Sequence, residues 1–302
     1  MSNHVLITGA TGMIGKALIK KLLDKGHRVS VLSRQLKPIP GVQVYLWDVP
    51  KQQMDERALD GVDTIIHLAG ASVADEKWTE KRKNEIVDSR VDSTALLYDT
   101  LSKHKNQVTA IISASAVGYY GDSGDEILTE ETEPGYDFLA RCCVEWENAV
   151  DKGKSLGLRI TKFRTGVVLD NKEGALPTMA KPVKLFVGAA LGTGKQWVPW
   201  IHLDDMVGMY IKALEDITFM GTYNGCAPYP VTNATLTKAL GKVLHRPIWP
   251  ISVPAKVLDL LLGEMSTIAL SSNNTSAQKI LNTGFSFKYI RLSEALSDIY
   301  RS

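Results

Sequence analysis

The chain has 302 residues, of which 44% are hydrophobic and 23% charged, and its formal net charge is +2. This length suits one large α/β domain with a smaller lobe, and the near balance of charge argues against nucleic acid as a partner. The start lacks a basic flank and no apolar stretch approaches membrane-spanning length, so we expect neither a signal peptide nor a membrane partner.

The first predicted element is a short apolar strand, Val5–Ile7, followed by a glycine-rich turn and a helix over Ile14–Lys25. Gly9, Gly12 and Gly15 are spaced for a tight turn, a close approach of the main chain to a pyrophosphate, and close packing of helix on strand. The N–H groups at the helix N-terminus then face the negative charge. We therefore expect a bound dinucleotide, with an ordinary glycine turn as the alternative. The residues expected to bind it are Thr8, Gly9, Thr11, Gly12, Met13, Ile14 and Gly15.

Further along the chain, apolar runs alternate with helical patterns, as in repeated parallel βαβ units. We predict strands at Arg28–Leu32, Val42–Trp47, Val62–Leu68, Val108–Ser113 and Leu158–Phe163, and helices at about Thr79–Lys103 and Asp137–Asp151. This order predicts an α/β fold with a Rossmann-type doubly wound parallel sheet. Such a sheet binds ligands at the carboxyl ends of its strands.

The alternating pattern ends after Gly166. A glycine- and proline-containing stretch, Gly174–Trp200, precedes predicted helices at Asp204–Leu214, Asn233–Leu244 and Ala255–Leu262 and a final helix ending at Tyr300. We predict a Rossmann domain over residues 1–170, to which 201–225 return. Residues 171–200 and 226–302 are expected to form a smaller mixed α/β substrate lobe.

The residues that follow the second and third strands suit the adenosine half of a dinucleotide. Ser33 and Arg34 stand where NAD-binding chains usually place Asp or Glu against the ribose 2′-hydroxyl. A hydroxyl and a guanidinium instead suit a 2′-phosphate, so we predict NADP(H), with NAD(H) as the alternative. A solvated surface role for Arg34 is the alternative. Asp48, which closes the third strand, is an expected acceptor for the adenine amino group.

The fourth strand ends in His67-Leu68-Ala69-Gly70, whose small residues allow a cofactor to pass close to the backbone. For His67 itself we expect a structural role. Leu68, Ala69, Gly70 and, at the end of the fifth strand, Ser113 complete the expected cofactor-binding set.

Five segments together resemble an extended short-chain dehydrogenase/reductase of the NAD-dependent epimerase/dehydratase family: Thr8–Gly15, His67–Gly70, Ser113–Gly121, Arg164–Leu169 and Trp200–Asp205. Further matches at Asp88–Val91, Trp146–Glu147, Gly192–Trp197, His245–Pro247 and Gly284–Phe285 resemble the branch in which an epimerase-like domain precedes a small C-terminal domain of unknown function. The likeness spans essentially the whole chain. It implies an NAD(P)-binding Rossmann domain with a substrate lobe, and it implies no particular substrate.

The chain departs from this family at the catalytic dyad, a Tyr general acid/base with a Lys four residues later. None of the ten tyrosines is followed by Lys at that distance. Alignment on Glu147 puts Leu139 and Cys143 at the two positions, or Phe138 and Cys142 in a register shifted by one residue. The family's Ser position is retained as Ser115.

We therefore predict that any chemistry is carried by Ser115, Tyr119, Tyr120 and Arg90. A phenol without a neighbouring cation keeps a pKa near ~10 and is a poor base at neutral pH, so we expect a poor general reductase. Arg90 and Arg141 are candidates for stabilising oxyanion charge. Cys143 is a candidate thiolate, although buried apolar cysteines are the simpler reading.

The three cysteines, Cys142, Cys143 and Cys226, are odd in number and two are adjacent, which favours free thiols and a cytoplasmic setting. No CxxC or HExxH spacing occurs, so the sequence predicts no metal site. The oligomeric state is left open.

Two later motifs resemble functional sites. Gly192–Lys195 resembles a phosphate-binding loop, but Gln196 replaces its Ser or Thr, so we expect no nucleoside triphosphatase. Lys195 and Gln196 either face the substrate or form a solvated loop. For His202 and Asp204, the family resemblance implies a structural network that docks the lobe on the sheet.

Two functions remain open. The first is an NADP(H)-dependent oxidoreductase acting on a small-molecule substrate, either a sugar nucleotide or another carbonyl or hydroxyl compound. The second is a catalytically weak or inactive NADP(H)-binding sensor or interaction protein.

Overall fold

One sheet of eight strands forms the centre of the structure, a computed structural model that describes residues 2–301. Its strands, in their order across the sheet, are β12 (Gly221–Gly225), β8 (Arg159–Thr165), β6 (Ala110–Ala116), β5 (Thr64–His67), β1 (His4–Thr8), β2 (Arg28–Ser33), β3 (Gln43–Asp48) and β4 (Gln53–Met54). All neighbours run parallel except β3 and β4. The predicted Rossmann-type α/β fold is confirmed, with a short antiparallel strand at one edge.

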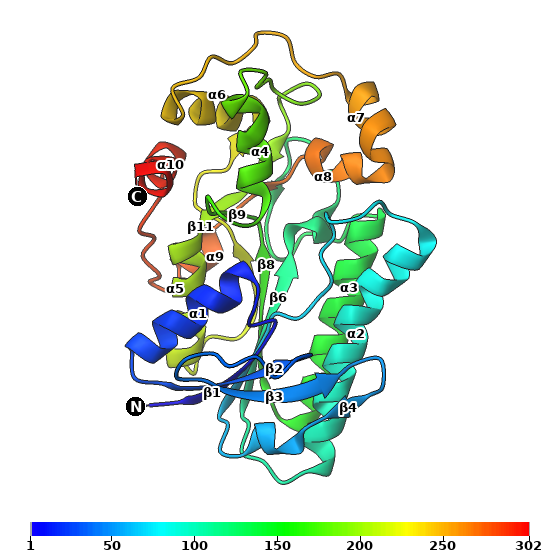
Figure 1. Cartoon of the computed structure of the whole chain (residues 1–302), viewed down its shortest axis with the longest axis vertical. Coiled ribbons are helices and arrows are strands. Elements are labelled where there is room, and N and C mark those ends of the chain that lie inside the picture. Colours follow the sequence, from blue (N-terminus) through cyan, green and yellow to red (C-terminus); the bar gives the residue numbers. More distant parts are fainter. Residues whose placement is uncertain (1, 302) are drawn as a thin grey trace.

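Two pairs of helices cover the faces of this sheet (Figure 1). The helices α1 (Met13–Asp24) and α5 (Leu203–Glu215) pack together on one face, and α2 (Glu80–Lys103) and α3 (Phe138–Asp151) on the other. Each of the four begins and ends within two residues of its predicted bounds.

Strand β1 shows why the predicted strands read as continuous apolar runs. Its Val5 and Ile7 belong to the core shared with α1 and α5, whereas Leu6 belongs to the core shared with α2 and α3. Successive side chains of a strand point to opposite faces, so a strand covered on both faces is apolar throughout.

The remaining elements build a lobe around a core of its own, which includes Leu176, Trp200, Leu236, Leu240 and Leu296. Its helices are α4 (Ala175–Lys184), α6 (Asn233–Val243), α7 (Ala255–Leu262), α8 (Thr267–Leu270) and α10 (Leu292–Arg301). Helix α9 (Gln278–Leu281) instead buries Ile280 in the core shared with α1 and α5. Three pairs of short strands accompany them: β7 (Ile127–Leu128) with β14 (Asn274–Thr275), β9 (Val167–Leu169) with β11 (Trp200–His202), and β10 (Trp197–Val198) with β13 (Val231–Thr232). Figure 1 shows the lobe above the sheet.

Helix α4 lies inside the stretch Gly174–Trp200, for which the sequence predicts no helix. Pro177 is its third residue, where the backbone N–H has no intrahelical partner and proline costs little. The helix buries Leu176, Ala180 and Val183, which follow the four- and three-residue spacing of one helical face. Tertiary packing of that face therefore outweighs the internal Pro182.

The expected structural role of His202 and Asp204 agrees with their contacts. The His202 ring caps α5 by accepting a hydrogen bond from the Asp204 amide at 3.0 Å. Asp204 forms an ion pair with Lys288 at 2.8 Å, and the neighbouring Asp205 carboxylate accepts from the Lys288 and Tyr289 amides. Burial lowers the pKa of His202, which favours the neutral ring. These contacts fasten the C-terminal segment to α5.

Within residues 2–301, no helix combines the length and the apolar character needed to cross a membrane. In the same described part of the chain, no group of three or more His, Cys, Asp and Glu side chains is placed to hold a metal ion.

Candidate functional site

A cleft of about 1430 Å³ runs along the carboxyl ends of β1, β2, β3 and β5. The strand ends contribute Gly9–Gly12, Ser33, Arg34, Asp48 and Leu68–Ala71 to its walls, and α2 contributes Asn84, Asp88, Ser89, Asp92 and Ser93. Its length, over four adjacent strand ends, suits an extended ligand better than a small one. The structure thus brings together most of the residues that the sequence predicts for the cofactor.

The three glycines of the turn occupy their positions for different structural reasons. Gly9 has a φ of +67°, and a Cβ there would lie 2.7 Å from the Leu68 carbonyl carbon. A Cβ on Gly15 would lie 2.6 Å from the Gly9 carbonyl oxygen, so the fold itself needs both glycines. A Cβ on Gly12 would meet only that oxygen, at 3.4 Å. Gly12 caps α1 without a side-chain hydrogen bond, which leaves the first N–H groups of the helix open to an anion.

Thr8 and His67 lock the ends of β1 and β5 together beneath the cleft. The Thr8 hydroxyl lies 2.7 Å from Nδ1 of His67 and accepts hydrogen bonds from the Leu68 and Ala69 amides, each at 3.1 Å. Nε2 of His67 lies 3.1 Å from the Thr94 hydroxyl. Burial, with a smaller effect of the Arg90 charge, lowers the pKa of His67 to about 4. His67 is therefore a neutral structural residue, as expected, and the Thr8 side chain is occupied within the protein.

Ser33, Arg34 and Asp48 lie at the outer end of the cleft. Arg34 is exposed, and the Ser33 hydroxyl accepts only a 3.3 Å hydrogen bond from the Gln35 amide among described residues. Asp48 forms an ion pair with Lys51 at 2.8 Å, and hydrogen bonds from Lys51 lower the pKa of its carboxyl. The contact of Lys51 with Asp48 was not predicted from the sequence. It leaves the Asp48 carboxylate partly occupied before any adenine binds.

The two positions of the family's dyad are apolar in this fold. Helix α3 begins at Phe138 and is capped by Asp137, whose side chain accepts a hydrogen bond from the Ala140 amide at 2.8 Å. A Cβ on Gly118, just after β6, would lie 3.3 Å from Cβ of Leu139 and 3.9 Å from Sγ of Cys143. Leu139 and Cys143 therefore pack against Gly118, and the choice between the two registers stays a prediction.

Cys143 is a protonated thiol at neutral pH. Burial, and then the neighbouring Cys142, raise its pKa to about 12, although Arg90 opposes the rise. The candidate thiolate role therefore has no support in the geometry, and the simpler reading of a buried apolar cysteine fits the side chain.

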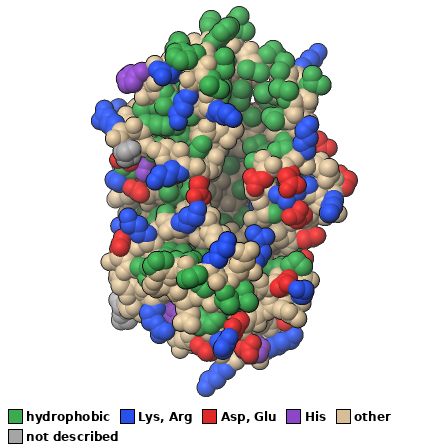
Figure 2. Space-filling view, viewed as in Figure 1, with side chains coloured by type: hydrophobic (Ala, Val, Ile, Leu, Met, Phe, Trp, Pro, Cys, Tyr) green, Lys and Arg blue, Asp and Glu red, His purple; other side chains and the backbone are tan. Residues whose placement is uncertain are grey.

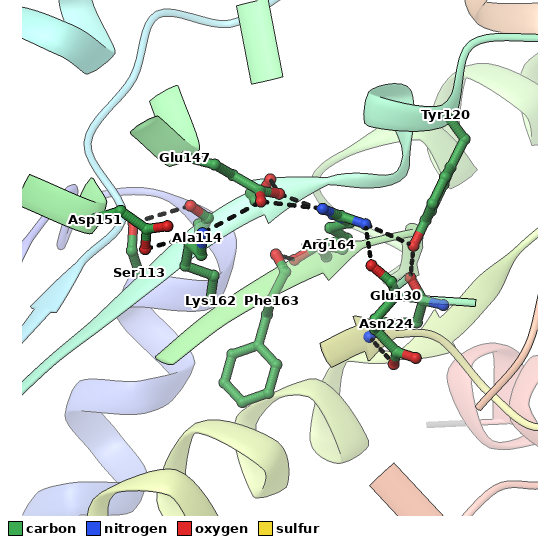
Figure 3. A network of polar contacts seen from close by, with 12 residues as sticks. Ser113, Ala114, Tyr120, Glu130, Glu147, Asp151, Lys162, Phe163, Arg164 and Asn224 are labelled. Atoms are coloured by element: carbon green, nitrogen blue, oxygen red, sulfur yellow. Dashed lines mark hydrogen bonds and ion pairs between the residues drawn. The ribbon is translucent and has the colours of Figure 1, made fainter. Parts of the chain in front are cut away.

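A buried polar network occupies the sheet beside these positions (Figure 3). Ser115 donates a 2.7 Å hydrogen bond to Oε1 of Glu147, and Arg164 donates to both carboxylate oxygens, from Nε at 2.8 Å and from Nη2 at 3.1 Å. Nζ of Lys162 lies 3.4 Å from Oε2. Burial alone would raise the pKa of Glu147, but Arg164 and then Lys162 hold it below its ordinary value. The Ser115 hydroxyl, only 3% exposed, is thus turned toward a buried carboxylate.

The same arginine reaches both candidate tyrosines. Nη1 of Arg164 donates to the Tyr120 hydroxyl at 3.1 Å, and that hydroxyl donates to Oδ1 of Asn224 at 2.7 Å. The guanidinium carbon lies 3.3 Å from the centre of the Tyr119 ring. The expectation of phenols without a neighbouring cation is therefore wrong.

The cation does not make either phenol a base. Burial raises the pKa of both Tyr119 and Tyr120, and Arg164 only partly opposes it. Burial is the largest cause at both phenols, and at Tyr119 the charge of Glu147 also raises the pKa. Both hydroxyls stay protonated at neutral pH, and of the two only Tyr119 is partly exposed.

Arg90 lies on α2 beside Gly70, which lines the cleft. A Cβ on Gly70 would lie 3.0 Å from the Arg90 guanidinium carbon, so this glycine makes room for the arginine. Nη1 of Arg90 donates to the carbonyls of Ala71 and Ile86, at 3.1 and 2.7 Å, and the guanidinium lies over the Trp146 ring at 5.0 Å. No carboxylate contacts it among the described residues. Arg90 is thus a cation held by backbone and aromatic contacts alone.

Other candidate residues lie outside this site. Gln196 is buried and donates to the carbonyls of Leu191 and Ala269, both at 3.0 Å, so it fastens its loop to α8. Lys195 is exposed. Arg141 is also exposed, and its Nη1 donates to the Tyr136 carbonyl. Ser113 is buried and donates to the carbonyl of Ala114.

Arg164 and Asn224 belong to the buried polar network, although neither was predicted from the sequence as a site residue. Arg164 and Lys162 are cations within the buried strand β8, and a cation in a buried strand requires a buried partner. That signal was available, although it could not identify Glu147 as the partner.

Comparisons with known proteins agree with this geometry. Residues 5–224 match the model of the NAD-dependent epimerase/dehydratase family, and residues 253–299 match a domain of unknown function, DUF1731. An epimerase family protein of Staphylococcus saprophyticus is 35% identical, over 98% of this chain and 99% of its own length, and the Bacillus subtilis epimerase family protein YfhF is 35% identical over 98% and 97%. The human epimerase family protein SDR39U1, whose crystal structure contains NADPH, is 30% identical with a TM-score of 0.87, over 99% of both chains.

Replacing Gly12 with Val should abolish dinucleotide binding while the protein stays folded. The added side chain meets only one protein atom but blocks the approach of a pyrophosphate to the helix N-terminus. Cofactor titration by calorimetry, with circular dichroism as the folding check, measures this. Gly15→Ala is the matched control, because its Cβ collides with the backbone and should lower stability instead. A folded Gly12→Val protein with unchanged cofactor affinity would contradict the site.

Replacing Glu147 with Ala should lower the free energy of unfolding by about 3–5 kcal/mol, because Arg164 is left buried without its partner. Urea unfolding followed by circular dichroism measures the change. Asp99→Ala, which removes an exposed ion pair with Lys103, is the control and should have little effect. Equal losses in the two variants would show that the buried network does not stabilise the fold.

Proposed function

The chain belongs to the NAD-dependent epimerase/dehydratase family, and we propose that it is an NADP(H)-dependent oxidoreductase of the extended short-chain type. The proposed substrate is a sugar nucleotide or another small carbonyl or hydroxyl compound. The observation that carries the proposal is the cleft over β1, β2, β3 and β5, which has an open helix N-terminus near one wall and Arg34 at its outer end.

The preference for NADP(H) over NAD(H) rests on charge at the end of β2. Ser33 and Arg34 line the cleft there, where an acid would accept the ribose hydroxyls of NAD(H). Arg34 is exposed and forms no ion pair with a described residue, so its planar donors are available for a phosphate. The NADPH in the crystal structure of human SDR39U1, a relative over nearly the full length, supports the same cofactor here.

Tyr119 and Arg90 suit proton donation better than proton removal. Bound NADP(H) would supply or accept a hydride. Tyr119 is partly exposed and protonated at neutral pH, so it can act as a general acid toward a developing alkoxide. Arg90 supplies positive charge that polarises a carbonyl. We therefore assign catalysis to Tyr119 and Arg90, in the direction of carbonyl reduction.

Ser115 and Tyr120 have a different role in this proposal. Both are buried, and their hydroxyls are bonded to Glu147, Arg164 and Asn224. They therefore position Arg164, which in turn lies against the Tyr119 ring. Of the four catalytic residues expected from the sequence, Tyr119 and Arg90 are thus proposed to contact the substrate. Ser115 and Tyr120 are proposed to act by positioning Arg164.

A second candidate function is an NADP(H)-binding protein with little or no turnover. The apolar pair Leu139 and Cys143 at the dyad positions favours it, because these side chains neither hold the nicotinamide ribose nor activate a phenol. Such a protein would report the cofactor or present a surface to a partner.

Replacing Arg34 with Ala should weaken NADP(H) binding by about tenfold or more and leave NAD(H) binding nearly unchanged. A charge-assisted contact to the 2′-phosphate contributes on the order of 1.5–3 kcal/mol. Calorimetric titration with both cofactors measures the difference. Arg28→Ala makes the same charge change at the start of β2, at the opposite edge of the sheet, and should alter neither affinity. Equal affinities of the natural protein for the two cofactors would overturn the preference.

A screen of carbonyl compounds and sugar nucleotides with NADPH, followed at the nicotinamide absorbance band, should find a narrow set of substrates that are reduced slowly. With the best of them, Tyr119→Phe should lower kcat by about a hundredfold or more, because the general acid is lost. Tyr136→Phe, at an exposed tyrosine, is the control. Rapid reduction of many simple aldehydes by the Tyr119→Phe protein would place the active site elsewhere, and tight NADPH binding without any turnover would favour the second function.

A further inference from the structure

Helix α7 in the C-terminal lobe is apolar but largely uncovered. It carries Val257, Leu258, Leu260, Leu261 and Leu262, and of its eight residues only Leu258 is buried. Leu260 is 85% exposed and Leu261 is 61% exposed. A helix with its aliphatic side chains in water departs from the usual pattern, in which the apolar face packs on a core.

Two other segments extend this exposed apolar surface. Leu185, Phe186 and Val187 follow α4, and Trp249 and Ile251 lie on the connection between α6 and α7; each is more than half exposed. The indole N–H of Trp249 donates to the Phe186 carbonyl at 2.9 Å, and its amide donates to the Gly188 carbonyl at 2.8 Å. The two segments therefore lie side by side.

These side chains lie at one end of the molecule. Figure 1 places α7, the connection between α6 and α7, and the end of α4 at the top of the long axis. In Figure 2 the same end is covered with hydrophobic side chains, and the acidic side chains on that face lie lower down. We call this surface the apical patch. It comprises Leu185, Phe186, Val187, Trp249, Ile251, Val257, Leu260 and Leu261.

The segments that build the apical patch are strongly basic. Residues 175–200 and 226–262 contain seven Lys or Arg residues and a single acid, Asp259, although the whole chain is close to neutral. The Asp259 carboxylate accepts a hydrogen bond from Ser266, and the Arg246 guanidinium lies over the Phe186 ring at 4.6 Å. The seven cations are Lys181, Lys184, Lys195, Lys238, Lys242, Arg246 and Lys256.

We propose that the apical patch docks the protein on the surface of an anionic lipid bilayer. Large aliphatic and aromatic side chains enter the headgroup region, and the surrounding Lys and Arg side chains attract the anionic lipids. Docking of this kind needs no helix that crosses the membrane. The expectation of no membrane partner rested only on the lack of a membrane-spanning segment in the sequence.

The positive charge and the protruding side chains of the segments that build the apical patch favour a lipid bilayer over a second copy of the chain or an acidic protein. In a symmetric dimer formed through the apical patch, the same cations would face one another across the interface, which is unfavourable. An acidic protein would match the charge but would also need a surface shaped to the protruding side chains. A bilayer accepts them without such a shape, so the combination of charge and protrusion favours lipid.

Flotation of the full chain with vesicles tests the proposal. The protein should float with vesicles that mix phosphatidylcholine and phosphatidylglycerol, should not float with phosphatidylcholine alone, and should dissociate as salt is raised. The double substitution Leu260→Ser and Leu261→Ser should weaken binding by about tenfold or more. Lys184→Gln with Arg246→Gln should weaken it while leaving the apolar side chains in place.

The matched control changes exposed apolar residues elsewhere. Ile217 and Met220 are 82% and 59% exposed and lie between α5 and β12, so Ile217→Ser with Met220→Ser should bind vesicles like the natural protein. Circular dichroism confirms that each variant is folded.

Three results would overturn the proposal. The first is an absence of flotation with the phosphatidylglycerol vesicles. The second is an equal loss of binding in the apical and control variants. The third is a dimer in solution that Leu260→Ser with Leu261→Ser converts to a monomer, which would show that a second copy covers the apical patch.

Discussion

The ion pair between Arg164 and Glu147 is the interaction on which the inner part of the site depends. It joins β8 to α3, and through hydrogen bonds it also holds Ser115 of β6 and Tyr120, which in turn contacts Asn224 of β12. Two charges removed from water are stable only when both are fully paired, and here the guanidinium and the carboxylate meet through two hydrogen bonds. One buried pair therefore fixes the relative positions of three strands and a helix.

This pair also limits the chemistry available beside it. A cation next to a phenol favours the phenolate, but burial raises the pKa of Tyr119 more than Arg164 lowers it, and the charge of Glu147 adds to the rise. Arg90, which lies at Gly70, has no carboxylate partner among the described residues. The residues expected to bind the cofactor and those proposed for proton transfer thus lie in separate parts of the fold, and loss of the dyad removes both a contact to the nicotinamide ribose and an activated phenol.

The cofactor half could be predicted from the sequence because its requirements are local. Gly9 and Gly15 are needed for the path of the main chain, and the ends of parallel strands meet at one edge of a sheet whatever the side chains are. The inner half depends on partners far apart in the chain. Ser115 and Glu147 are 32 positions apart, and nothing in the spacing shows that the serine hydroxyl turns toward α3. Helix α4 was missed for a similar reason, since only packing against the lobe outweighs its prolines.

The net charge of the chain also hides how charge is distributed along it. The net charge of +2 summarises a chain whose α4 to α7 segments carry seven cations against one acid, so the remaining residues are acidic on balance. An average near zero excludes a uniformly basic protein, and it says nothing about a basic end. Only the fold shows that the same segments also carry exposed aliphatic and aromatic side chains. Interaction surfaces are therefore better judged from the charge of each lobe than from that of the chain.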